Sequence, residues 1–284
     1  LGAFLPLPGW APRGYPRAAR DAAAEIRGLI AEMCRQRQAD IAAGTAPQDL
    51  ATKIMTTPDP QTGQTFSTGE MVDQVAIFFL AGHETSASVL AWALYLLATH
   101  ADFQEKVADE AAAFAENPSF AALSTLPQTR NVFREALRLY PPVPMMVRET
   151  TRAETFRKRA LRRGAQIVIS PWHLHRHTAH WHEADEFDPD RWDRAETQAS
   201  QRDAYLPFSA GQRVCPGAGF AMAEGVVMLA VFVSRWAFSA GQHPVPRPVA
   251  HLTLRSRDGI WLDVAQRAVR RDAVPSDPPA RKAG

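Results

Sequence analysis

A cysteine among glycines is the strongest chemical signal in the chain. Cys215 lies in the segment 208–217, FSAGQRVCPG, directly before an apolar stretch that predicts a helix. Proline suits the first helical position, so Pro216 would place Cys215 at the positive end of the helix dipole. Arg213 adds a nearby cation, and both effects favour the thiolate over the thiol. Glycine lets the backbone approach a flat, bulky partner. The pattern therefore predicts a metal ligand or a nucleophile, with an inert buried cysteine as the alternative.

Two further patterns place polar groups inside predicted helices. Glu135 and Arg138 are three residues apart, so they share a helix face and can pair, although such pairs are usually solvated. The segment 81–86, AGHETS, interrupts a helix that is otherwise apolar on every side, and polar groups in such surroundings need partners. One partner for Thr85 would be a backbone carbonyl one turn earlier, which would bend the helix.

Histidine is concentrated in one short segment, which raises the question of a zinc site. Five histidines lie within ten residues: His173, His175, His177, His180 and His182. Their spacing fits no standard zinc pattern. We therefore expect a partly exposed loop and keep a zinc protein as the alternative.

The elements that would position these groups are mainly helical. The longest predicted helix starts at Ser67, which forms a capping-box pattern with Glu70, and runs to about Thr99. Its middle, 75–82, is apolar all round and is therefore expected to be buried. Apolar periodicity predicts the other helices at 17–43, about 102–115, 128–140 and 216–236.

Short strands and loops fill the rest of the chain. Strands are expected within 143–151 and 166–170, joined by an arginine-rich stretch, and within the tail, 249–266. Asp258-Gly259 is a hairpin-turn signal in that tail, and 183–213 has the composition of a loop. Helices come first and mixed structure follows, so the fold class is mainly α with small β-sheets.

Composition excludes several classes of protein. The 284 residues are 46% hydrophobic and 22% charged, as in globular proteins, and the net charge of +2 gives no sign of nucleic-acid binding. Two cysteines, Cys34 and Cys215, cannot build a disulfide framework, which favours a reducing, cytoplasmic location. No uninterrupted apolar run reaches the roughly 18 residues of a membrane span.

Taken together, these motifs resemble the cytochrome P-450 family. The loop meets every fixed position of the family pattern Phe-x-x-Gly-x-Arg-x-Cys-x-Gly, Glu135-x-x-Arg138 precedes Tyr140-Pro141-Pro142, and 187–192, FDPDRW, resembles the loop that completes the Glu-Arg pair. The resemblance runs from about residue 21 to 266 but covers only the later part of the family's length. It implies a cytochrome P-450 fold truncated at its N-terminus. We expect one domain over 1–267 and a disordered tail over 268–284.

The resemblance also implies a haem-thiolate site. Cys215 would be the axial ligand of the iron in haem b (iron protoporphyrin IX), and a thiolate ligand favours O–O cleavage. Glu84 and Thr85 would form an acid–alcohol pair that delivers protons. The other residues implied to contact the cofactor are Arg213 and Arg148, each with a propionate, and Phe208, Gly217 and Ala81. A buried structural network would join Glu135, Arg138 and Arg191.

The implied activity is monooxygenation, with one oxygen atom of dioxygen entering an apolar organic substrate. A ferredoxin or flavoprotein reductase would dock near the cysteine loop, on a basic patch of Arg130, Arg134, Arg202 and Arg213. Two alternatives stay open: a peroxygenase driven by hydrogen peroxide, and a non-catalytic haem-binding remnant. Without an N-terminal part, apolar surface beside the haem would be exposed, so we expect either a longer chain or a homo-oligomer to cover it.

Overall fold

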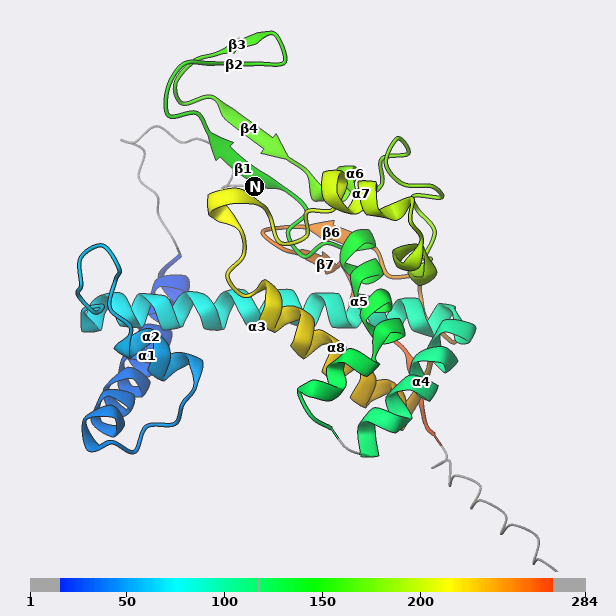
Figure 1. Ribbon diagram of the computed structural model, residues 1–284, viewed down its shortest axis with the longest axis horizontal. Coiled ribbons are helices and arrows are strands. Elements are labelled where there is room, and N and C mark those ends of the chain that lie inside the picture. The colour runs from blue at the N-terminus through cyan, green and yellow to red at the C-terminus, as the bar shows by residue number, and fades with distance from the viewer. Residues whose placement is uncertain (1–15, 117, 268–284) are drawn as a thin grey trace, which may run out of the picture.

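Helices dominate the computed structural model, which describes residues 16–116 and 118–267 (Figure 1). The α-helices are α1 (Arg17–Ala43), α2 (Leu50–Thr56), α3 (Thr68–Thr99), α4 (Ala101–Glu116), α5 (Pro127–Leu139), α6 (Pro171–Leu174), α7 (Thr197–Ala204) and α8 (Ala218–Arg235). Short 3-10 helices span Ala121–Thr125, Pro189–Asp193 and Gly211–Arg213.

The five long predicted helices are confirmed, including the capping box of Ser67 and Glu70. Helix α7, within 197–204, lies where a loop was expected, and the predicted tail, 268–284, lies outside the described residues.

The strands form four two-stranded antiparallel sheets. The pairs are β1 (Met146–Glu149) with β4 (Gln166–Ile169), β2 (Glu154–Phe156) with β3 (Arg159–Leu161), β5 (Trp236–Ser239) with β8 (Asp263–Gln266), and β6 (Pro248–Ala250) with β7 (Leu254–Ser256). The prediction of a hairpin turn at Asp258-Gly259 is wrong, because that pair connects β7 to β8, which belong to different sheets. The class, mainly α with small sheets, is confirmed.

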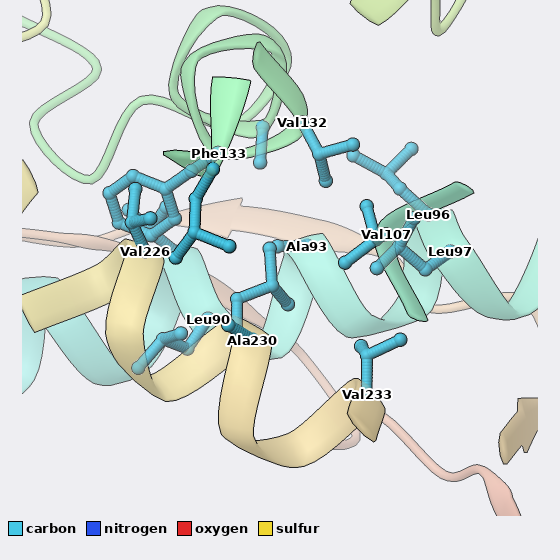
Figure 2. Close-up of a cluster of buried hydrophobic side chains, with 14 of the residues drawn as sticks. Leu90, Ala93, Leu96, Leu97, Val107, Val132, Phe133, Val226, Ala230 and Val233 are labelled. Carbon is cyan, nitrogen blue, oxygen red and sulfur yellow. The ribbon is translucent and has the colours of Figure 1, made fainter. Parts of the chain in front are cut away.

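The main core lies where α3, α4, α5 and α8 meet. Figure 2 shows Phe133 and Val226 at one end of this core and Leu97 and Val107 at the other, one residue from each of these helices. Helices α5 and α8 approach closely because Gly225 has no side chain, and a Cβ there would overlap the Phe133 ring. The core therefore fixes the orientation of α8, the helix that follows Cys215.

The middle of α3 departs from the sequence-based expectation. Ile77, Phe79 and Leu80 are 59%, 64% and 53% exposed, whereas residues 89–97 of the same helix supply much of the core. The prediction that 75–82 is buried is wrong for this structure, because α4, α5 and α8 cover only the C-terminal half of α3, while α1 and α2 cover only its start, at Met71 and Val72. An apolar face is left uncovered by the described part of the chain.

Two helices, α3 and α8, are long and apolar enough to cross a membrane, judged by length and composition alone. In this structure they pack against each other, and both supply side chains to the main core. The absence of a membrane span, expected from the sequence, therefore stays a prediction.

Candidate functional site

Cys215 lies at the surface in the loop between the 3-10 helix Gly211–Arg213 and α8. Its backbone N–H donates to the carbonyl of Phe208 at 2.8 Å and closes the loop. Ser209 and Gly211 shape that closure with φ of 64° and 68°, in the left-handed region that favours glycine. The side chain of Phe208 packs on the main core, so the loop is anchored at its start and its thiol faces outward.

The helix that follows the cysteine starts later than expected. Gly217 is the N-cap of α8 and Ala218 its first residue, so the prediction that Pro216 opens the helix is wrong. The backbone N–H of Ala218 donates to the carbonyl of Cys215 at 3.3 Å. Cys215 is thus joined directly to the first turn, whose dipole favours negative charge nearby.

Two arginines expected near the cofactor lie beside this loop. Arg148, on β1, donates to Oγ of Ser209 at 2.9 Å and so connects the β1–β4 sheet to the cysteine loop. Arg213 is exposed and has no hydrogen-bond or ion-pair partner within the described ranges. Both guanidinium groups keep donors that could meet carboxylates, which guanidinium binds well.

The polar segment of α3 is held by two different elements. The hydroxyl of Thr85 donates to the carbonyl of Ala81 at 2.7 Å, one turn earlier in the same helix. The carboxylate of Glu84 instead accepts from the hydroxyl of Thr253 and, at 2.7 Å, from Nε of Arg255, both near the β6–β7 turn. These two bonds, Thr253 first, lower the pKa of Glu84 below its ordinary value. The two members of the expected acid–alcohol pair therefore have separate partners.

Sequence analysis did not predict Arg255, on β7, as a partner of Glu84. Thr253-Leu254 resembles the family's tail hairpin, but no local pattern links residue 255 to residue 84, because 171 positions separate them. The hairpin is further fixed by the hydroxyl of Ser88, which donates to the carbonyl of Leu254 at 2.6 Å. The β6–β7 turn is therefore attached to α3 at two points, one of which is Glu84.

The expected structural network is present as a buried ion cluster. Glu135 pairs with Arg138 at 2.8 Å and with Arg191 at 2.9 Å, and all three side chains are almost fully buried. The remaining donors of the two arginines bond to backbone carbonyls of the segment 175–186, namely those of His175, His182, Glu183, Ala184 and Glu186. Each charge is thus paired, as a buried charge must be. The network ties this loop to α5.

The histidine segment is a loop around one buried ring. Nε2 of His175 accepts from the backbone N–H of Leu206 at 2.8 Å, and Nδ1 lies 3.1 Å from the carbonyl of Arg138. Burial lowers its pKa to about 3. The other four histidines are exposed. Among residues 16–116 and 118–267, no three His, Cys, Asp or Glu side chains gather as metal ligands.

The exposed groups of the described chain suit a flat apolar cofactor with two acidic arms. The cysteine loop carries the thiol and Arg213, Arg148 lies beside it, and uncovered apolar side chains occur on α3, at β1 and near Cys215. The uncovered side chains are Ile77, Phe79, Leu80, Met145, Val147, Val214 and Phe220. Apolar surface on this scale normally has a partner. The residues present therefore fit haem, and Cys215 supplies the one thiol among them that could become a thiolate ligand of iron.

Known proteins of one family resemble most of the chain. The family model described as Cytochrome P450 matches residues 2–261. Cyclooctat-9-en-7-ol 5-monooxygenase of Streptomyces melanosporofaciens is 35% identical over 85% of this chain and 50% of its own length. Cytochrome P450 4A10 of Mus musculus is 36% identical over 71% of this chain and 40% of its own length.

Solved structures give the same result. The crystal structure of the cytochrome P450DA heme domain matches with a TM-score of 0.80 and 29% identity, over 89% of this chain and 56% of that chain. The chain spans about half the length of these relatives. With its loop pattern, its ion cluster and these matches, the chain belongs to the cytochrome P450 family.

Proposed function

We propose that this chain carries the haem-thiolate site of a monooxygenase that inserts one oxygen atom of dioxygen into an apolar organic substrate. Proteins of the family bind haem b. The observation that carries the proposal is the outward-facing thiol of Cys215, in a loop closed on Phe208 and joined to the first turn of α8. An iron ligand needs this accessibility, whereas a structural cysteine such as Cys34 is buried.

The residues around the loop would hold the cofactor by sulfur, charge and shape. Cys215 would ligate the iron, and Arg148 and Arg213 would each bind a propionate carboxylate. Phe208 and Gly217 would keep the loop close to the ring. On the α3 side, Ala81 would contact the cofactor and Gly82 would leave room above it. When bound, haem supplies dioxygen activation and the redox chemistry, while the protein supplies ligand, polarity and proton delivery.

Proton delivery would depend on Glu84 and Thr85. Glu84 is held by Thr253 and Arg255, and Thr85 by the Ala81 carbonyl, so neither side chain bonds to the other. A proton could pass between them through water, or after Glu84 leaves Arg255. Arg255 would therefore position Glu84, and the β6–β7 turn would influence proton transfer from a distance in sequence.

The exposed groups at the site favour a class of substrate and a docking face for the electron donor. The uncovered side chains are apolar, which favours an apolar substrate; one relative is named for oxidising cyclooctat-9-en-7-ol. A ferredoxin or flavoprotein reductase would dock on the face that carries the cysteine loop, beside a hollow of about 480 Å³ lined in part by Arg130, Arg134 and Phe208. Of the four arginines expected there, Arg202 pairs with Asp203, Arg134 stacks on Trp192, and Arg130 donates to the carbonyl of Leu123 at 2.9 Å. Arg213 has no hydrogen-bond or ion-pair partner among the described residues.

A spectrum of the reduced protein with carbon monoxide tests the proposal. The haem-loaded chain should show the red-shifted Soret band of thiolate ligation, and Cys215→Ser should abolish it. Cys34→Ser is the matched control and should keep the band, because that thiol is buried away from the loop. A band that survives Cys215→Ser would overturn the ligand assignment. Turnover with hydrogen peroxide in the absence of a reductase would favour the peroxygenase alternative.

A further inference from the structure

Positive charge is concentrated in the hairpin between β1 and β4. Residues 152–163 hold six of the 32 basic residues of the chain and one of its 30 acidic residues, so the rest of the chain has a net charge of −3. The six are Arg152, Arg157, Lys158, Arg159, Arg162 and Arg163. The overall charge of +2 is therefore the sum of a strongly basic hairpin and an acidic remainder of the chain, which we call the acidic body.

The turn of this hairpin holds two of the cations in an unfavourable backbone conformation. The β2–β3 register ends on the pair Phe156↔Arg159, which leaves Arg157 and Lys158 as a two-residue turn with φ of 48° and 65°. Turns with two positive φ values favour Asn-Gly, because most L-residues are strained there. The sequence keeps two charges at the tip at the expense of backbone strain, and such positions often have a functional role.

The charges of the hairpin are not used for folding. Arg152 pairs with Glu154 at 2.6 Å, and the other five cations have no acidic partner in the described part of the chain. All six side chains are exposed. Figure 1 shows β2 and β3 extending beyond β1 and β4, away from the helices. The hairpin thus presents unpaired cations to a partner outside the molecule.

We propose that the β2–β3 hairpin binds the anionic headgroups of a lipid bilayer. Besides its cations it exposes Phe156, at 55%, next to the turn, and an aromatic side chain among cations suits the interface between headgroups and acyl chains. Each Lys or Arg near an anionic membrane adds to binding, without the need for a complementary shape.

An acidic protein partner fits the hairpin less well. Two strands of three residues offer little of the roughly 800 Å² per partner that a specific protein interface needs. A wider contact would also bring the acidic body against an acidic partner. A bilayer can contact the tip alone, and repulsion of the body is screened beyond about 8 Å at physiological ionic strength.

Co-sedimentation of the full chain with vesicles tests this proposal, and it does not require haem. Binding should occur with phosphatidylcholine vesicles that contain phosphatidylglycerol and be absent with phosphatidylcholine alone. The double variant Arg157→Asn, Lys158→Gly removes two charges and installs the favoured turn sequence, so the hairpin should stay folded. It should weaken binding about 30-fold. Phe156→Ser, which leaves the charge unchanged, should weaken it several-fold.

A matched control separates the hairpin from net charge. Arg247→Gln with Arg257→Gln removes two exposed arginines from the β6–β7 hairpin and should leave binding unchanged. Equal loss in both double variants would overturn the proposal, and so would failure of the wild-type chain to bind anionic vesicles. Capture by polyglutamate without vesicle binding would also overturn it, in favour of an acidic protein partner.

Discussion

The two halves of α3 have the same apolar character and different surroundings. Leu97 is fully buried and Leu90 nearly so, whereas Phe79 and Leu80 are more than half exposed (Figure 2 shows the buried half). The C-terminal half is covered by α4, α5 and α8. In the N-terminal half, α1 and α2 bury Met71 and Val72 and leave Phe79 and Leu80 open. An apolar sequence thus shows that a surface needs covering, but not whether protein or another group covers it.

A similar contrast separates the two charged clusters. The cluster of Glu135, Arg138 and Arg191 is buried and complete within the described residues. The pair of Glu84 and Arg255 is partly exposed, so water screens the attraction between the two charges. We expect the first cluster to matter for stability and the second for control of the site.

The largest expected effect is loss of the buried carboxylate. Glu135→Gln should lower the free energy of unfolding by about 3–5 kcal/mol, because it leaves two buried guanidinium groups without a counter-charge. Urea denaturation measures this change. The control is Glu154→Gln, whose exposed pair with Arg152 should change stability by less than about 1 kcal/mol. Similar losses in both variants would show that burial does not distinguish these pairs.

Two leucines on α3 give a matched test of the apolar contrast. Leu97→Ala should lower the free energy of unfolding by about 2–5 kcal/mol, because it opens a cavity in the core. Leu80→Ala, in the apoprotein, should change it by less than about 0.5 kcal/mol, since that side chain is 53% exposed. Denaturation of both variants without haem measures the difference. A large loss for Leu80→Ala would show that another surface, such as a second copy, already covers it.

Much of the fold follows from local sequence. Five long helices could be predicted because their apolar periodicity and the Ser67–Glu70 cap act within a few residues. The β2–β3 hairpin could not, because two cations occupy the turn positions that Asn-Gly usually signals. The Asp258-Gly259 signal was misleading, since β8 pairs with β5, more than twenty residues earlier, and not with β7.

Some residues of the site could likewise be predicted from local sequence, and others could not. The cysteine loop and the Glu135–Arg138 pair are contiguous motifs, and the structure places Arg191 against Glu135 as the family resemblance implies. The contact of Arg255 with Glu84 depends on the tertiary arrangement of the β6–β7 turn, and no spacing rule reaches that far. Which pairs form across such distances is decided by the fold and not by local sequence.

His175 should make stability depend on pH over a defined range. Its pKa is about 3 in the folded protein and near the ordinary histidine value of 6.5 in the unfolded chain. Between these values the unfolded chain binds the extra proton, so stability is full above about 6.5 and falls as pH decreases towards 3. From pH 7.5 to pH 5 the loss should be about 2 kcal/mol. His175→Gln should flatten the profile measured by urea denaturation, and an unchanged profile would assign the pH dependence to other groups.

The smallest expected effect concerns the partly exposed pair. A double-mutant cycle with Glu84→Gln and Arg255→Leu should give a coupling energy of about 0.2–1 kcal/mol at pH 7, typical of such pairs. Because the folded pKa of Glu84 is lowered, this coupling is present above the unfolded value of 4.5 and is lost as pH falls through the folded pKa. Arg257→Leu, on the same hairpin, should show no coupling with Glu84.

Glutamine retains an acceptor for the Thr253 hydroxyl, so the cycle isolates the ion pair from the hydrogen bond beside it. Coupling that persists well below the folded pKa would mean that Arg255 acts on the hairpin by packing and not by charge. Coupling that disappears there, together with faster hydrogen exchange of residues 250–256 in Arg255→Leu, would show that the charge of Glu84 holds the β6–β7 turn against α3. The partly exposed pair of Glu84 and Arg255 would then be a pH-sensitive contact, whereas the buried cluster of Glu135, Arg138 and Arg191 would keep its contacts over the same pH range.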